Sequence, residues 1–407
     1  MSSLRSLLPA LRSKTYFNYG GQGPLPDPSL AAILQAFQTI QELGPFADPV
    51  WPYAQQLTNN LKQRLSQWLG VGVHRLALSE NVTSGCVLPL WGLPWREGDR
   101  LLVGDAEHPG VVAACRELAQ RHRLAWDDLA VADLRSNADE AAEAVLERLE
   151  AALTPRTRLV VLSHLLWNTG QLLPISAVAA HLAGHPARPW LLVDAAQSLG
   201  SLPLDGTTTG AATSAGAAAG AAAAADIYAC TGHKWCCGPE GLGVVALSER
   251  LLAEGRPTLI GWRSLADEAR GGSAFHADAR RFEVASSCLP LTAGLERSLA
   301  LLEAEGDAEA RLGRIRQRSR QLWEGLQRLP GATPLLQSPP PAGLVSFNLE
   351  DRQGRPLPPK RVVQALGAQG IWLRTLHDPA CIRACTHLVS SGAEVETLLA
   401  ALEDLVG

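Results

Sequence analysis

The chain has 407 residues, a net charge of −4 and 46% hydrophobic residues, which predicts two or three folded domains and excludes a mainly disordered protein. It has no apolar run of the roughly 18 residues that cross a bilayer and no long basic run, so we expect neither a membrane nor a nucleic-acid partner. The N-terminal stretch is too interrupted for a signal peptide, and eight cysteines without a CxxC pair are typical of a reduced, cytoplasmic protein.

Residues 1–26 are expected to form an N-terminal arm, and residues 27–265 a large domain. In the large domain, short apolar runs alternate with helical patterns, which predicts an α/β fold with a mostly parallel sheet covered on both faces. The expected strands are residues 101–105, 158–164, 190–196, 226–232 and 242–248. The expected helices between them are residues 110–122, 138–152 and 174–183.

Residues 206–225 interrupt the large domain with a low-complexity segment. Eleven of its twenty residues are alanine, and it carries no charge. A loop between two strands can lengthen at low thermodynamic cost. We interpret this segment as an insert that forms a mobile surface loop without a function.

The pattern changes from residue 266 to the C-terminus. Long charged helical patterns at 291–304 and 308–328 precede short strands at 344–349 and 383–389 and a last helix at 392–405. This order predicts a smaller α+β domain over residues 266–407. Histidines and cysteines occur in its last third, but their spacing fits no common zinc pattern, and we expect no metal.

The basic residues are distributed unusually, because only four are lysines and 32 are arginines. Lys14, Lys62 and Lys360 lie in polar stretches and are predicted to be solvated. Lys234 instead lies between a strand-like run and a glycine-rich turn, in YACTGHKWCCGPEG. Its apolar setting calls for a chemical explanation.

Asp194 ends an earlier predicted strand, in VDAAQS. Open α/β sheets bind ligands at the carboxyl ends of their strands, so Asp194 and Lys234 are expected at one such edge. An aspartate and a lysine placed in this way suit pyridoxal 5'-phosphate (PLP). The lysine forms a Schiff base with its aldehyde, and the aspartate keeps the pyridine nitrogen protonated.

The sequence resembles the class V aminotransferase family of fold-type I PLP enzymes, which includes cysteine desulfurases and isopenicillin epimerase-like proteins. Within this family it is most similar to the cyanobacterial-type L-cysteine/cystine C–S lyases. The resemblance extends over almost the whole chain and rests on the segments ENVTSGCVLPLWGL, DAEHPG, LSHLLWNTGQLLP, TGHKW, IGWRS and RFEVAS.

The resemblance implies roles for five residues around the cofactor ring. Lys234 would carry the cofactor, Asp194 would pair with the pyridine nitrogen, and Gln197 would reach the phenolic oxygen. His108 would stack on the ring, and Asn168 would lie near the phenolic oxygen and the substrate carboxylate.

The phosphate would be held by Thr83 with neighbouring backbone N–H groups, together with Thr231 and His233. The N-terminus of a helix, which Thr83 is expected to open, suits a phosphate dianion. Ser286 lies where the family usually has a threonine from the neighbouring subunit, which implies a homodimer with shared active sites.

The substrate contacts are also implied by the resemblance. Arg383 would bind the α-carboxylate of an amino acid, and Arg374 the distal carboxylate that cystine has and cysteine lacks. Trp262 would cover that distal end from the other subunit.

The expected activity is β-elimination on L-cystine or L-cysteine, giving pyruvate, ammonia and a persulfide or sulfide. The persulfide would serve a sulfur-acceptor protein, for example in iron–sulfur cluster supply. Cysteine desulfurases carry a cysteine on a loop that corresponds to residues 336–343, which contain none here. A desulfurase, an epimerase, an aminotransferase and a non-catalytic PLP-fold scaffold remain the alternatives, because one cofactor shell supports several outcomes.

Overall fold

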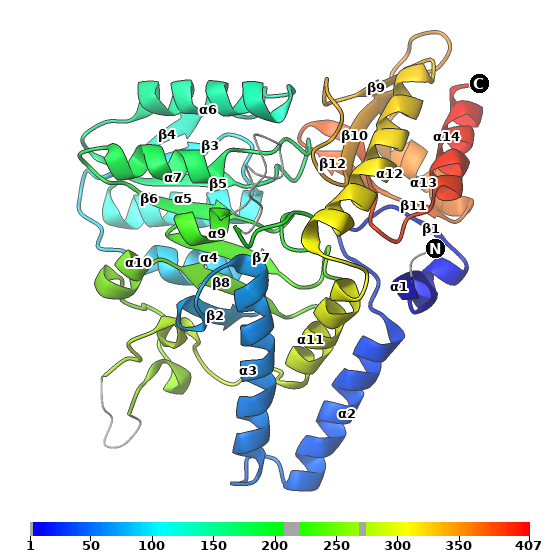
Figure 1. Ribbon diagram of the computed structural model, residues 1–407. Coiled ribbons are helices and arrows are strands. Elements are labelled where there is room, and N and C mark those ends of the chain that lie inside the picture. Colours follow the sequence, from blue (N-terminus) through cyan, green and yellow to red (C-terminus); the bar gives the residue numbers. More distant parts are fainter. Residues whose placement is uncertain (1–2, 207–219, 268–273) are drawn as a thin grey trace.

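The computed structural model describes residues 3–206, 220–267 and 274–407, and its centre is a seven-stranded sheet (Figure 1). The strands of this sheet are β2 (Leu76–Ser79), β3 (Arg100–Gly104), β4 (Ala125–Leu129), β5 (Thr157–Ser163), β6 (Trp190–Asp194), β7 (Ile227–Thr231) and β8 (Gly243–Leu247). They are ordered β2-β8-β7-β6-β5-β3-β4, and only β8 runs antiparallel to its neighbours. The predicted α/β class with a mostly parallel sheet is confirmed.

Helices cover both faces of this sheet because its strands are apolar on both sides. In β5, Val160 and Leu162 belong to one hydrophobic core, and Leu159 and Val161 belong to another on the opposite face. The first core includes residues of α6 (Ala138–Ala152), α7 (Ile175–Gly184) and α9 (Ala221–Ala224). The second includes residues of α4 (Val82–Trp91), α5 (Pro109–His122) and α10 (Glu249–Glu254).

The predicted strands of the large domain all form, within one or two residues at most ends, but β2 and β4 were not predicted. β4 is an edge strand with the sequence AWDDL, and its half-exposed Asp127 pairs with Arg100. It therefore lacks the apolar run by which the other strands were recognised. β2 has only four residues.

The alanine-rich segment corrects one prediction. Residues 207–219 lie outside the described residues, so the prediction of a surface loop stays open there. Residues 220–225 are not an exposed loop, because Ala221, Ala222 and Ala225 are fully buried in the core that also contains Leu182 of α7. Alanine side chains are small enough to let α9 approach its neighbours closely, which the low-complexity composition does not reveal.

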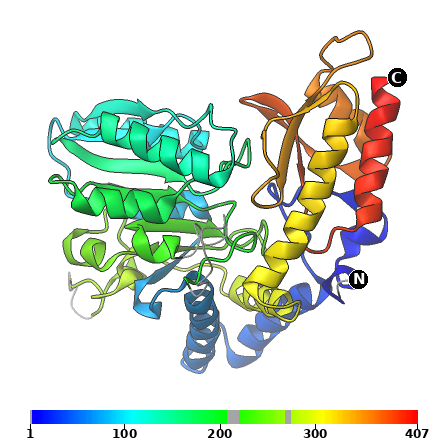
Figure 2. The same ribbon diagram turned by 45° about the horizontal axis from the view of Figure 1, so that its top comes forward.

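A second, antiparallel sheet lies beside the first (Figure 2). Its strands are β9 (Ala332–Pro334), β10 (Leu344–Leu349), β12 (Arg374–His377) and β13 (Ala380–Cys385), in the order β12-β13-β10-β9. A separate hydrophobic core joins this sheet to α12 (Ala308–Arg328), α13 (Pro359–Ala368) and α14 (Gly392–Val406). The expected α+β character of the C-terminal part is observed, while the boundary at residue 266 stays a prediction.

The N-terminal segment packs on the C-terminal part of the chain. β1 (Thr15–Tyr16) pairs in parallel with β11 (Ile371–Trp372), and in α1 (Ser3–Ser6) the Arg5 side chain forms an ion pair with Glu394 at 2.8 Å. The following helices are α2 (Asp27–Leu43) and α3 (Val50–Leu69), both of which pack against α11 (Pro290–Glu303) (Figure 1). Across residues 3–206, 220–267 and 274–407, no helix is both long and apolar enough to cross a membrane.

Candidate active site

Asp194 and Lys234 lie at the carboxyl ends of two adjacent parallel strands. Asp194 is the last residue of β6, is buried, and accepts a hydrogen bond from the Ala196 N–H at 2.9 Å. Lys234 follows β7 by three residues. Removal from solvent lowers the pKa of the Lys234 ammonium to about 8, against the opposing effect of the nearby Asp194 carboxylate. The predicted pair is therefore brought together at one sheet edge.

Two arginines of the small sheet face this edge. Arg374 of β12 and Arg383 of β13 are directly opposite each other in the antiparallel register. Arg383 is 2% exposed, and its Nη1 donates to the Trp167 carbonyl at 2.7 Å. Its Nε and Nη2 have no hydrogen-bond partner in the described parts of the chain. A buried guanidinium with two free donors fits a carboxylate, whereas Arg374 is exposed at the mouth of the site.

His108 and Asn168 line a cavity of about 220 Å³ together with Arg374. His108 precedes α5, and its Nδ1 accepts from the Gly110 N–H at 3.2 Å. Burial lowers the pKa of His108, so its imidazole is neutral at pH 7 and can stack on an aromatic ring. Asn168 donates from Nδ2 to the Asp378 carbonyl at 3.2 Å, and its Oδ1 is buried without a partner among the described residues.

The N-terminus of α4 lies over the end of β7. A Cβ atom on Gly85 would be 3.1 Å from the Cβ of Ala229, so helix and strand touch one turn after the helix begins. Thr83 is in that first turn, where backbone N–H groups have no intrahelical partners. Near it, Thr231 ends β7, and its Oγ1 is 2.7 Å from His233 Nδ1. This group of hydroxyl, imidazole and amide donors can hold a phosphate.

Gln197 is held by the N-terminal segment and by the loop after β7. Its Nε2 donates to the Gly20 carbonyl at 3.0 Å, and its Oε1 accepts from Trp235 Nε1 at 2.8 Å. A Cβ atom on Gly20 would be 2.8 Å from Cys385 Sγ, so only glycine allows this close approach. The sequence did not indicate that an N-terminal segment contributes to the site.

Two predicted site residues lie elsewhere. Trp262, which begins the short helix η3 (Trp262–Ser264), packs on Trp51 with ring centroids 6.3 Å apart. Ser286 is exposed, in the segment that follows η5 (Ala279–Phe282). Among the described residues, neither lines the cavity of His108.

Glu107 is a buried acidic residue that the sequence reasoning did not single out. Its two carboxyl oxygens accept from the backbone N–H and the Oγ of Ser163, at 2.6 and 2.7 Å. Burial and, to a smaller extent, the neighbouring Asp194 raise its pKa to about 8, against the opposing effect of the Ser163 hydrogen bonds. Glu107 is thus mostly protonated at neutral pH. Only its position before His108 could have drawn attention to it.

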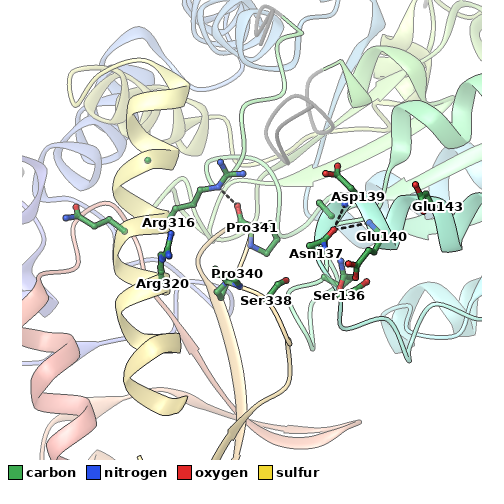
Figure 3. A pocket seen from close by; sticks show the side chains of 15 residues that line it. Ser136, Asn137, Asp139, Glu140, Glu143, Arg316, Arg320, Ser338, Pro340 and Pro341 are labelled. Carbon is green, nitrogen blue, oxygen red and sulfur yellow. Dashed lines mark hydrogen bonds between the residues drawn. The ribbon is translucent and has the colours of Figure 1, made fainter. Parts of the chain in front are cut away.

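A larger hollow, of about 850 Å³, lies between the beginning of α6 and α12 (Figure 3). Acidic side chains such as Asp139 and Glu143 line one wall, and Arg316 and Arg320 line the other. None of the predicted site residues lines it. Size therefore does not identify the site, whereas the half-buried Lys234 and the buried Asp194 and Arg383 do.

The sheet with an aspartate and a lysine at adjacent strand ends, next to a smaller C-terminal sheet, is the architecture of fold-type I PLP-dependent enzymes. The residues present fit that cofactor, because a lysine with a lowered pKa faces a buried carboxylate and the unsatisfied donors of Arg383. Residues 51–398 match the family described as Aminotransferase class-V. The chain belongs to the class V aminotransferase family and is a PLP-dependent enzyme.

Solved structures and curated relatives agree with this assignment. A complex of the cystine C–S lyase C-DES with its product cysteine persulfide is 41% identical, with a TM-score of 0.88, and covers 98% of this chain and 99% of that one. A cysteine desulfurase from Thermococcus onnurineus, 21% identical with a TM-score of 0.83 over 100% and 99% of the two chains, shares the fold. The isopenicillin N epimerase of Streptomyces clavuligerus is 28% identical over 96% of this chain and 94% of its own.

Proposed function

We propose that this enzyme is a carbon–sulfur lyase that performs β-elimination on L-cystine, and less efficiently on L-cysteine. The observation that carries the proposal is the pair of opposed arginines. The buried Arg383 suits the α-carboxylate, and the exposed Arg374 suits a second carboxylate at the mouth, which cystine has. The 41% identity to the cystine C–S lyase C-DES supports the same substrate class.

Each residue of the site has a separate role in the proposed reaction. When bound, PLP supplies an electron sink for the electron pair left at the substrate Cα. Lys234 takes the Cα proton as general base, favoured by its lowered pKa, while Asp194 would hold the pyridine nitrogen of the cofactor. The Cβ–S bond then breaks, and water converts the three-carbon fragment to pyruvate and ammonia. From cystine, the leaving group is cysteine persulfide, which we propose is passed to a sulfur-acceptor protein.

The segment between β9 and β10 argues against desulfurase chemistry. That chemistry needs a cysteine thiolate that attacks the substrate sulfur, and residues 336–343 provide no cysteine. Cys385 does lie beside Arg383, but burial raises the pKa of its thiol, which keeps it protonated and unreactive. Elimination needs no such thiolate, so it is the outcome that these residues favour.

We also propose a homodimer in which each subunit completes the other's site. Leu30, Leu34 and Phe37 form an exposed apolar stripe on α2, with helical spacing. Trp262 is likewise exposed, and Ser286 offers an exposed hydroxyl group. A second copy would cover the stripe and receive both side chains. The eight free cysteines are consistent with a cytoplasmic location, which we propose as well.

The experiment is a pyruvate and sulfide assay with purified holoenzyme on cystine, cysteine and alanine. We expect pyruvate from cystine in stoichiometric amount with persulfide, less from cysteine, and none from alanine. Lys234→Ala is the matched control, and it should lose both turnover and the yellow absorbance near 420 nm while remaining a folded dimer. Alanine as the main sulfur-free product of cysteine would show a desulfurase and refute the proposal.

A further inference from the structure

Lys62 of α3 forms a buried ion pair that the sequence did not predict. Its polar surroundings in the sequence indicated a solvated side chain, but Lys62 is 4% exposed and its Nζ is 2.6 Å from Glu283 Oε1. The same carboxyl oxygen accepts from the Leu78 N–H of β2 at 3.0 Å. Glu283 is thereby fixed to two elements of the large domain at once.

Glu283 also fixes the turn that carries Trp262. Its backbone carbonyl accepts from Ser264 Oγ at 3.1 Å, and the Val284 carbonyl accepts from the Arg263 N–H at 3.3 Å. A Cβ atom on Gly261 would be only 2.0 Å from that Val284 oxygen, so the two segments are in direct backbone contact. The turn of Trp262 therefore moves with Glu283 and Val284.

Ser286 follows Glu283 by three residues and is exposed. The two residues that are proposed to act in the partner's site, Trp262 and Ser286, are thus both attached to the backbone that the Lys62–Glu283 pair holds. The ion pair does not belong to the cavity of His108, whose lining includes neither Lys62 nor Glu283.

Stability alone explains such a pair poorly. Taking an ammonium and a carboxylate out of water costs several kcal/mol each, so a buried ion pair often stabilises a fold no better than apolar side chains of similar size. The pair has a larger effect on geometry. The Glu283 carboxylate, which accepts from both Lys62 and the Leu78 N–H, has few alternative positions. Lys62 and Glu283 line one cavity, whose other charged or titratable side chains are His74, Arg263, His276, Asp278 and Arg280. Asp278 is already paired with Arg280 at 2.8 Å.

We propose that Lys62 and Glu283 are positioning residues that set Trp262 and Ser286 for the active site of the partner subunit. The inference rests on the shared site proposed above. It does not depend on which reaction that site performs, because its first readout is cofactor affinity measured without substrate.

The first test is titration of apoenzyme with PLP. Lys62→Met should raise the dissociation constant for PLP by about tenfold, as expected when one charge-assisted phosphate contact is misplaced, and should leave a folded dimer. Glu283→Gln should act in the same direction, and Lys62→Arg should be nearly normal. Arg64→Met is the matched control. Arg64 lies two residues after Lys62 on α3, and it pairs with Glu296 rather than with Glu283. An equal loss of PLP affinity in Arg64→Met would show a general stability effect and overturn the proposal.

The second test places the defect in the correct subunit. In a hybrid dimer, one subunit carries Lys62→Met and the other carries Lys234→Ala. One of its two sites then has Lys234 from the Lys62→Met subunit, and Trp262 and Ser286 from the other subunit, whose Lys62 is intact. That site should recover normal PLP affinity and turnover. A hybrid of Ser286→Ala with Lys234→Ala serves as the reference.

The outcomes separate the two proposals. Recovery in both hybrids supports positioning across the interface. Recovery in the Ser286→Ala hybrid alone shows that Lys62 acts within its own subunit and overturns the positioning role. Recovery in neither overturns the shared site itself, and the positioning role with it.

Discussion

The sheet edge at Asp194 and the face that carries Trp262 are built differently, and we propose that both contribute to one site. At the sheet edge, polar side chains are buried and bonded within one chain, as in the contacts of Gln197 with Gly20 and Trp235. On the Trp262 face, Trp262 and Ser286 are exposed, while the backbone beside them is held by hydrogen bonds such as that from Ser264 Oγ to the Glu283 carbonyl. The polar groups of the first region are bonded within one chain, and we propose that those of the second act in the partner subunit.

This difference indicates which region supplies the contacts that bind the cofactor and select the substrate. Interactions of charged groups are strongest where water is excluded, so we expect the contacts that hold the ring and the α-carboxylate to come from the buried edge. Under the proposed dimer, we expect the exposed face to be constrained only by the second copy. Each of the following predictions tests one side of this contrast.

The largest effect should come from separating the subunits. Leu30→Glu combined with Leu34→Glu places two carboxylates on the α2 stripe, where both side chains are exposed in the single chain, so folding should be unaffected. Burying them in an interface is costly, and the dimer dissociation constant should rise by on the order of 100-fold or more. Sedimentation should show monomers, and turnover should be lost.

Gln35→Glu is the control for this experiment, because Gln35 is exposed on the same helix, directly after Leu34. It adds a charge without removing an apolar side chain and should remain dimeric and active. Full turnover by a monomeric double variant would show that one chain completes its own site.

The next largest effect concerns the two arginines, one from the buried edge and one at the open mouth. Arg383→Ala should lower kcat/KM for cystine and cysteine alike by about 2–5 kcal/mol, or roughly 30-fold to several thousand-fold, since a buried charge-assisted pair is lost. Arg374→Ala should lower kcat/KM for cystine by about tenfold and affect cysteine little. The measurement is the ratio of kcat/KM for cystine to kcat/KM for cysteine in each variant. An unchanged ratio in Arg374→Ala would exclude a role for Arg374 in binding the distal carboxylate of cystine.

The last prediction concerns Glu107, and its effect is a pH dependence of stability rather than a change in turnover. The folded protein raises the pKa of Glu107 to about 8, so it retains a proton that the unfolded chain has released. The resulting stabilisation is complete below about pH 4 and is lost as the pH rises through about 8, by on the order of 5 kcal/mol. Glu107→Gln should lack this decline. Urea unfolding of holoenzyme across that range measures the difference, and parallel pH profiles of the two proteins would contradict it.

The sequence predicts the regular elements well because their cores are periodic. The strand around Val160 and the helix at 308–328 show apolar patterns that tertiary contacts reinforce, and both form where expected. β4 was missed because an edge strand can consist of half-exposed acidic residues. The roles assigned to the site residues came from resemblance, and periodicity alone would not have found them.

What the sequence could not predict are contacts between distant segments. Lys62 looks polar in its local sequence, and only the fold shows that Glu283 comes within 2.6 Å of it. The contribution of Gly20 depends on chain ends meeting, which no local pattern encodes. Buried alanines in α9 carry no signal at all, because alanine is common both in cores and in loops.

The pairing of β1 with β11 has a consequence for how the enzyme is made. Thr15 aligns with Ile371, so the N-terminal segment finds its partner only after almost the whole chain has left the ribosome. Such distant pairings slow folding and come late, after the local helices and the first strands have formed. Gly20 and Gln197 meet through that same segment. Capture of the cofactor is therefore expected to be one of the last events in biogenesis, and a nascent chain that lacks its final strands should hold no PLP.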